Sequence, residues 1–197
     1  MNDLFLKSIR KFTDISTEEA AFFFSFFEEK KYKKNTVLLR EGEVSHELYF
    51  VTRGALRQFF SKEDGVEKTC NFTFEEEFFT DLESFSRKSC AVTNIITSEP
   101  TECLVITCED LVEAMKQSAA VAELCRTIVE KMATANIKRI QSLLSLSPEN
   151  QFKALTQRSP QILQRVPQRY IAQYLGLAPE SLSRIRKRIL ITKQSLT

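Results

Sequence analysis

The chain has 197 residues, of which 43% are hydrophobic and 27% are charged, and this composition is typical of a soluble globular protein with one or two small domains. Its only dense apolar run near the start, Ala20 to Phe27, is much shorter than the ~20 residues that a membrane span needs. We therefore predict neither a signal peptide nor a membrane span, and we expect a cytoplasmic protein.

The cysteines are odd in number and widely spaced, and no two of them form a C-x-x-C pair. Their positions are Cys70, Cys90, Cys103, Cys108 and Cys125. This spacing argues against a disulfide framework, a zinc site and an iron–sulfur cluster, so no metal is expected. We interpret the thiols as buried or half-buried side chains in a reducing compartment.

Charge is distributed unevenly along the chain. The first 146 residues contain 19 Lys and Arg against 24 Asp and Glu, whereas the last 51 contain 9 against 2. A basic C-terminal part suits a partner with a phosphate backbone, because Lys and Arg that bind phosphates release condensed counterions. A merely solvated basic tail would have the same composition, so this feature alone leaves both interpretations open.

The first part of the chain changes from helical to β-rich patterns. Ser16 with Glu19 three residues later matches a capping box, which predicts a helix that ends in the charged stretch Glu28 to Lys34. From Thr36 to Thr107, short β-rich runs alternate with turn residues. Many short strands at this spacing predict a small antiparallel barrel or roll.

A long helix is predicted between Ser118 and Leu146, where apolar residues recur at spacings of three or four. Such a helix, of about 28 residues, is longer than a small barrel can cover, and its narrow apolar stripe suits a partner helix. We expect two copies of the chain to pair along it around a two-fold axis. The residues assigned to this pairing are Cys125, Val129, Met132 and Asn136. The alternative is a stripe that packs wholly within one chain.

A separate C-terminal domain is predicted after the long helix. Ser147 and Pro148 mark the start of a new helix, with the serine as its cap, and Ser159 with Pro160 marks its end. The sequence thus predicts a β-rich domain over residues 1–117, the long helix over 118–146 and a C-terminal domain over 147–197.

The segment VPQRYIAQYLGLAPESLSRIRKR, from Val166 to Arg188, predicts a helix-turn-helix. Pro167 opens the first helix, Gly176 supplies a tight turn in which a left-handed backbone costs little, and Pro179 starts the second helix. The small side chain of Ala172 lets the two helices cross closely.

The second helix has a polar, basic face that suits DNA. At about 100° per residue this face lies opposite the apolar residues Leu182, Ile185 and Ile189. Arg can donate two hydrogen bonds to a guanine edge, Glu can accept one from cytosine, and Ser and Lys can hold phosphates. Arg186 falls nearer the inner side, which favours a structural role. The candidate DNA-binding residues are Arg169, Glu180, Ser181, Ser183, Arg184, Lys187 and Arg188. The alternative is a helical hairpin with a solvated basic face.

This segment and EGEVSHELYFVTRGALRQFF, at Glu41 to Phe60, resemble the catabolite-activator and fumarate–nitrate-reduction (Crp-Fnr) regulator family, particularly its short Bacteroidetes-like members. The resemblance covers most of the chain. It implies an α+β fold with an N-terminal cyclic-nucleotide-binding-type β-roll as sensor, a long dimerisation helix and a C-terminal helix-turn-helix. Glu180 and Arg184 fall on the family's base-reading positions. The implied partners are double-stranded DNA and a second copy of the chain, with RNA polymerase as a further candidate.

The phosphate cassette of family members that bind cyclic AMP is altered here. Thr80 stands in place of a glycine, Asp81 in place of a glutamate, and Cys90 with Ala91 about where an arginine is expected, whereas Leu82 is kept. A cyclic phosphate needs backbone donors and a guanidinium fork, so we expect no tight binding of cyclic AMP and no cofactor.

Other polar groups of the sequence could form an effector site. Arg87 or Lys88 could replace the missing arginine, although both are better interpreted as solvated loop charges. Thr134 and Asn136 on the long helix could close over another small molecule, and an effector-free regulator is the alternative. The candidate ligand residues are Thr80, Asp81, Leu82, Arg87, Lys88, Cys90, Thr134 and Asn136.

Two other classes of protein fit the sequence less well. An enzyme is not expected, because the single histidine, His46, is interpreted as an exposed turn residue and the acidic clusters lack metal-site spacing. A cyclic-nucleotide-binding-like signalling or adaptor module that acts through a protein partner leaves the basic face of the second helix unexplained. Only nine residues follow Arg188, too few for a two-stranded wing.

Overall fold

The computed structural model describes residues 2–61 and 65–194, and it divides into two compact units. The first unit holds the residues up to Phe60 together with Asn71–Thr134, and the second holds the described part of 61–70 and the residues from Ala135 onward. The division falls inside one long helix. The domain boundaries predicted after residues 117 and 146 stay predictions.

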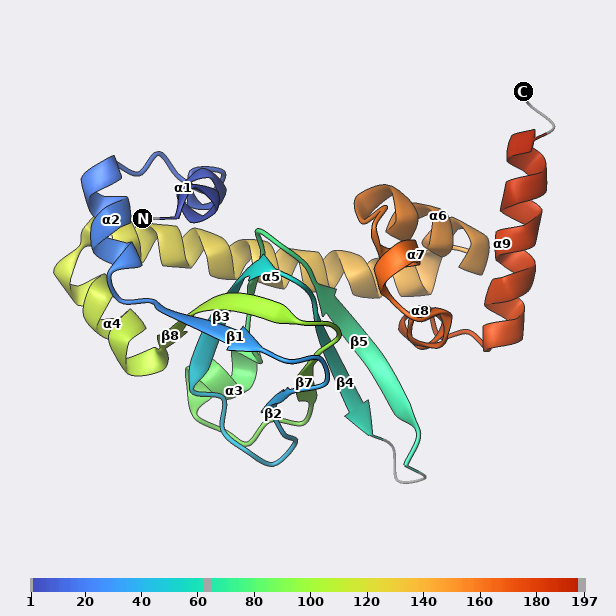
Figure 1. Cartoon of the computed structure of the whole chain (residues 1–197), viewed down its shortest axis with the longest axis horizontal. Helices are drawn as coiled ribbons and strands as arrows, with labels where there is room; N and C mark the ends of the chain where they lie inside the picture. Colours follow the sequence, from blue (N-terminus) through green and yellow to red (C-terminus); the bar gives the residue numbers. More distant parts are fainter. Residues whose placement is uncertain (1, 62–64, 195–197) are drawn as a thin grey trace. The chain divides into compact units, whose positions relative to one another are not determined.

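Short helices come first along the chain, strands follow, and helices complete it (Figure 1). The helices are α1 (Asp3–Ile9), α2 (Thr17–Phe24), α3 (Leu82–Arg87), α4 (Cys108–Gln117), α5 (Ala119–Ser145), α6 (Pro148–Arg158), α7 (Ile162–Arg165), α8 (Gln168–Tyr174) and α9 (Pro179–Gln194). The strands are β1 (Glu28–Tyr32), β2 (Val37–Leu39), β3 (Glu47–Arg53), β4 (Leu56–Ser61), β5 (Glu67–Thr73), β6 (Phe78–Phe79), β7 (Asn94–Thr97) and β8 (Thr101–Thr107). The predicted α+β class is confirmed.

The strands form a roll of two four-stranded sheets, with the orders β1-β8-β3-β6 and β2-β7-β4-β5. Antiparallel ladders join β8 to β1 and β3, and β7 to β2 and β4. Buried apolar side chains from both sheets pack together, among them Val51 of β3, Leu56 of β4 and Ile95 of β7. The antiparallel roll predicted from the short β-rich runs is therefore confirmed.

The prediction for the stretch Glu28 to Lys34 was wrong, because its first five residues form strand β1 instead of ending a helical segment. None of the side chains of β1 is fully buried, so this strand lacks the apolar alternation that reveals a half-buried strand. Its ladder with β8, from the pair Glu28 and Val105 to the pair Tyr32 and Thr101, fixes it in the sheet. Strand β6 is only two residues long and lies within the predicted β-rich range.

The two N-terminal helices pack on the roll through phenylalanine side chains. The hydroxyl of Ser16 caps α2 by accepting a hydrogen bond from the backbone N–H of Glu19, at 3.1 Å, as predicted. The carboxylate of Glu19 instead accepts a hydrogen bond from Ser118, the residue before α5. Phe5 and Phe23 are fully buried against Phe50 of β3, which gives this first unit an aromatic core.

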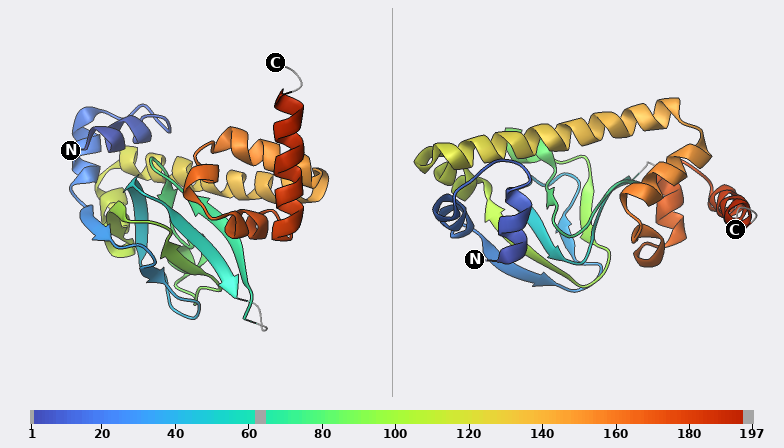
Figure 2. Two further views of the ribbon diagram at one scale, coloured as in Figure 1. Left: turned by 45° about the vertical axis from the view of Figure 1, so that its right-hand side comes forward. Right: turned by 90° about the horizontal axis from the view of Figure 1, so that it is seen from above.

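Helix α5 has 27 residues and lies within the predicted range. Figure 2 shows it from two further directions as one uninterrupted helix. Ser147 caps the following helix, α6, by accepting a hydrogen bond from the backbone N–H of Asn150, and Ser159 follows its last residue, as predicted. Among the described helices, none combines the length and the apolar character that a membrane crossing needs.

Candidate nucleic-acid interface and ligand cassette

Helices α8 and α9 form the predicted helix-turn-helix. Pro167 immediately precedes α8, and Pro179 is the first residue of α9. Gly176 has a φ of +68°, a left-handed conformation that glycine adopts without strain, and its backbone N–H donates to the carbonyl of Gln173 at 3.1 Å. The turn therefore depends on the glycine that the sequence singled out.

The inner faces of the two helices are buried as predicted. Ala172 of α8 and Leu182 of α9 are completely inaccessible to solvent, and Ile171 and Ile185 are also buried. A helix crossing this close needs a small side chain on at least one helix, which Ala172 provides. The packing fixes which face of α9 points outward.

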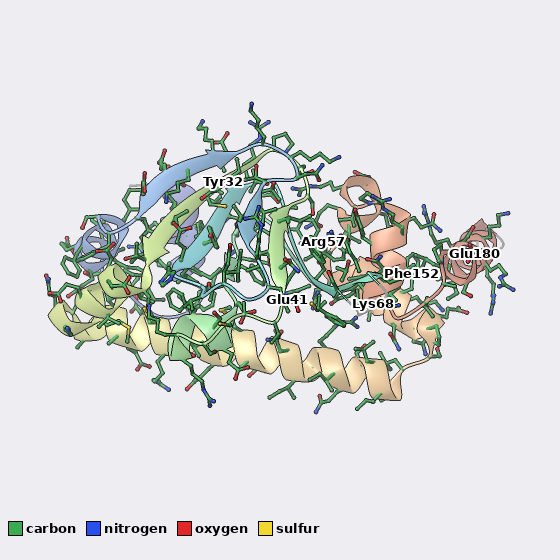
Figure 3. The ribbon with its side chains drawn as sticks, turned by 90° about the horizontal axis from the view of Figure 1, so that it is seen from below. Tyr32, Glu41, Arg57, Lys68, Phe152 and Glu180 are labelled. Atoms are coloured by element: carbon green, nitrogen blue, oxygen red, sulfur yellow. The ribbon has the colours of Figure 1, made fainter. Side chains whose placement is uncertain are left out.

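The outward face of α9 carries the predicted DNA-binding groups. Figure 3 views α9 nearly along its axis and labels Glu180 on it. The residues assigned to DNA are exposed or half-buried on this helix: Glu180, Arg184, Lys187 and Arg188 are exposed, and Ser181 and Ser183 are half-buried. A row of such groups has the length and chemistry of a helix that reads a major groove.

Three arginines of α8 and α9 make contacts within the chain. Arg188 lies 3.4 Å from the carboxylate of Glu149 on α6, and hydrogen bonding from Lys153 lowers the pKa of Glu149. The pair is solvent-exposed and therefore weak, so Arg188 can exchange this partner for a phosphate. Arg186 donates to the side-chain oxygen of Gln168 on α8 at 3.0 Å, in keeping with a structural role. Exposed Arg169 donates to the hydroxyl of its neighbour Tyr170 at 2.8 Å.

The altered cassette forms a hydrogen-bonded network around Asp81. This buried carboxylate caps α3 by accepting a hydrogen bond from the backbone N–H of Ser84, and its second oxygen accepts one from the hydroxyl of Thr93 at 2.7 Å. The hydroxyl of Thr93 in turn accepts a hydrogen bond from the side-chain amide of Gln58, at 2.9 Å. Both partners of the carboxylate are neutral donors, so neither compensates its charge.

Thr80 is buried and has partners within the roll. Its hydroxyl lies 3.0 Å from the hydroxyl of Ser45 and donates to the backbone carbonyl of Glu47 at 2.9 Å. Leu82, the retained residue of the cassette, is half-buried at the start of α3. The side-chain oxygens of Thr80 and Asp81 therefore already have hydrogen-bond partners within the roll.

Arg87 and Lys88 both point to solvent. Arg87 lies 3.9 Å from Glu83 on the same helix, and Lys88 lies 3.1 Å from Glu109 at the start of α4. Hydrogen bonds to Cys108 and Glu109 raise the pKa of Lys88. Cys90, about where the arginine was expected, is exposed, so the interpretation of the thiols as buried or half-buried was wrong for this residue. The interpretation of Arg87 and Lys88 as solvated loop charges agrees with these positions.

The predicted pairing stripe of α5 is divided between two environments. Cys125 is only 8% exposed and lies in the core of its own chain, and Met132 packs partly against the same core. A side chain buried in this way is unavailable to a partner helix, so the assignment of Cys125 to the pairing needs correction. Val129 is 44% exposed, and Asn136 and Thr134 are exposed too.

Three further apolar residues of α5 lie open to solvent and were not singled out from the sequence. Ile137, Ile140 and Leu144 are 56%, 57% and 83% exposed. They follow one another at spacings of three and four, which is the signal that could have identified them.

The cysteines and the histidine have no catalytic arrangement among the described residues. Burial raises the pKa of Cys103 and of Cys125 to about 12, which makes both thiols unreactive. The five cysteines form no disulfide, and no cluster of metal-ligating side chains occurs in the part of the chain that the structure describes. His46 is exposed, as expected for a turn residue.

The comparisons with known proteins identify the domain and the fold. A family model, described as the cyclic nucleotide-binding domain, matches residues 29–118. No curated protein matches the chain. FixK2 from Bradyrhizobium japonicum has a similar structure, with a TM-score of 0.72 and 17% identity over 85% of this chain and 86% of that one.

Two other solved structures are similar. A transcriptional regulator of the Crp/Fnr family from Eubacterium rectale has a TM-score of 0.67 and 19% identity, over 91% of this chain and 85% of that one. The c-di-GMP-responsive global regulator CLP from Xanthomonas campestris has a TM-score of 0.66 and 16% identity, over 90% of this chain and 93% of that one.

Residues 29–118 thus match the family of the cyclic nucleotide-binding domain. The chain as a whole has the fold of the Crp/Fnr transcription regulators, and the resemblance predicted from the sequence is confirmed for the domain and for the fold.

Proposed function

We propose that the chain is a sequence-specific DNA-binding transcription regulator of the Crp-Fnr type that acts in the cytoplasm. The observation that carries this proposal is the outward face of α9, where Glu180, Arg184 and Lys187 are exposed and the opposite face is buried against α8. Arg184 would contact a guanine edge, Glu180 a cytosine amino group, and Lys187 a phosphate.

A homodimer on a palindromic site is the form that fits this regulator best. Val129, Ile137, Ile140 and Leu144 leave an apolar row on α5 that a second copy of the same helix would cover. Two copies related by a two-fold axis would present two α9 helices to DNA. Their half-sites would lie about 34–36 Å apart, one turn of the duplex.

The cyclic nucleotide-binding domain would serve as a sensor for a ligand other than cyclic AMP, or as a scaffold without a ligand. The uncompensated carboxylate of Asp81 and the outward direction of Arg87 and Lys88 support this proposal, since an anionic phosphate needs a cation in its place. CLP, which has the same fold, is described as responsive to c-di-GMP, so a regulator of this type can have a different effector.

Competition gel shifts test the DNA-binding face directly. Arg184→Ala should lose about 1–3 kcal/mol of binding free energy at the cognate site and relax one base preference, because it removes a bidentate base contact. Lys187→Ala is the matched variant, because it also removes one positive charge from the exposed face, but it should weaken binding to all duplexes similarly. Wild-type discrimination between duplexes by Arg184→Ala would reject the proposal.

A further inference from the structure

Arg139, in the last third of α5, holds the end of α8. Its guanidinium donates a hydrogen bond to the backbone carbonyl of Tyr174, the last residue of α8, and its central carbon lies 3.6 Å from the centre of the Tyr174 ring. Carbonyl groups at the end of a helix lack partners inside the helix and attract a positive charge. Arg139 therefore caps α8 and stacks on its last side chain with the same group.

Tyr174 contacts residues from several elements of the second unit. Its ring is buried, and its hydroxyl accepts a hydrogen bond from Arg158 at the end of α6, at 3.3 Å. The neighbouring side chain of Gln173 accepts a hydrogen bond from the hydroxyl of Thr69 on β5, at 2.9 Å. The end of α8 thus contacts residues of α5, α6 and β5.

The position of Arg139 carries an energetic cost that a simple surface contact would not require. Burial lowers the pKa of Arg139, and its Nε atom is buried without a hydrogen-bond partner in the described part of the chain. The planar guanidinium can lie flat against the ring while it donates a hydrogen bond in its own plane, whereas an ammonium is a compact charge without such a plane. Arg139 therefore fixes the orientation of α8 relative to the end of α5, in addition to joining the two helices.

The orientation of α8 determines that of α9. The two helices are joined by a short turn, and they are packed together through buried Leu182 and Ile185 and the hydrogen bond between Arg186 and Gln168. Any rotation of α8 about the end of α5 would therefore move α9 with it.

We propose that Arg139 is a positioning residue that sets the direction in which the end of α5 presents α9, and thereby selects the spacing between the two half-sites of the operator. This inference rests on the proposed function, because it presupposes that two copies of α9 bind one duplex. Without Arg139, each helix-turn-helix would still recognise its half-site, but the pair would accept a wider range of spacings.

Fluorescence anisotropy with three duplexes tests this role. One duplex carries the palindrome selected by the wild-type protein, the second carries the same half-sites two base pairs further apart, and the third carries a single half-site. Two base pairs rotate one half-site by about 70° relative to the other, so we expect wild type to prefer the first duplex over the second at least about tenfold. In Arg139→Ala this preference should fall below about threefold, while the affinity for the single half-site stays within about twofold of wild type.

Lys138→Ala is the matched control, because it removes one positive charge from the adjacent, exposed position of α5. It should keep the wild-type spacing preference. Arg139→Lys keeps the charge without the planar group, so it should show a spacing preference between those of wild type and Arg139→Ala. If the alanine variant does not fold, Arg139→Lys replaces it in the comparison.

Three results would overturn the inference. The first is a wild-type spacing preference in both Arg139 variants. The second is a loss of single-half-site affinity equal to the loss on the palindrome, which would assign Arg139 to the folding of the helix-turn-helix. The third is an absence of DNA binding by the wild-type protein, which alone of the three would also reject the proposed function.

Discussion

The cassette residues bond to partners within the roll. Asp81 uses both carboxylate oxygens to hold α3 and Thr93, and Thr80 donates its hydroxyl to a backbone carbonyl. Arg87 and Lys88 form exposed ion pairs instead of facing this network. An anion brought to the cassette would lose its hydration and meet a negative charge, which costs free energy unless a cation compensates it.

Isothermal titration calorimetry with cyclic AMP and cyclic GMP tests this conclusion. We expect no binding, or a dissociation constant weaker than about 100 μM, because Arg87 and Lys88 point to solvent and do not replace the hydration of the phosphate. A micromolar or tighter constant would contradict the expectation. Its loss in Arg87→Ala or Lys88→Ala would identify the residue that replaces the missing arginine.

The sequence predicted single residues well where the signal was local. Gly176, Pro179 and Ser147 have the backbone positions that their residue types indicated, because a turn glycine, a first-turn proline and a capping serine each act on their own few neighbours. The contact of Arg139 with Tyr174 joins residues 35 positions apart, and no local pattern announces it.

Among the elements, α5 shows the limit of periodicity. Its range was predictable because apolar residues recur at helical spacing over many turns. The same period could not show which face of α5 packs on the core of its own chain. Val121, Leu124 and Cys125 face the core of their own chain, so the exposed row begins at Val129 and continues through Ile137 and Ile140. Strand β1 shows the opposite limit, because its mostly exposed residues carry no apolar period at all.

The exposed row of α5 predicts that Val129→Asp disrupts the proposed dimer, because a charge at a helix pair cannot be desolvated cheaply. Sedimentation at micromolar concentration should then show a monomer, and affinity for a palindromic duplex should fall at least about tenfold as the second half-site contact is lost. Val112→Asp is the matched control, since Val112 on α4 is also 44% exposed and should leave the dimer intact. A wild-type protein that sediments as a monomer, or a Val129→Asp protein that remains a dimer, would contradict this prediction.

At the scale of the whole molecule, the sequence already predicted the basic C-terminal part and the order of roll, long helix and helix-turn-helix. The last 51 residues contain 9 Lys and Arg against 2 Asp and Glu, and they include α8 and α9. One of the two acidic residues, Glu149, pairs with Lys153 and Arg188, and the other, Glu180, lies on the outward face of α9. A module this rich in positive charge has few functions that fit it better than contact with a nucleic-acid backbone.

Selection of duplexes from a random DNA pool by the full-length wild-type protein tests the central claim most directly. We expect the enriched sequences to contain a palindrome whose half-sites lie about one helical turn, or roughly 10 base pairs, apart. The same selection with Arg184→Ala should enrich sites that are degenerate at one position of each half-site. A pool that stays random after repeated rounds with the wild-type protein would contradict the assignment of α9 as a DNA-reading helix.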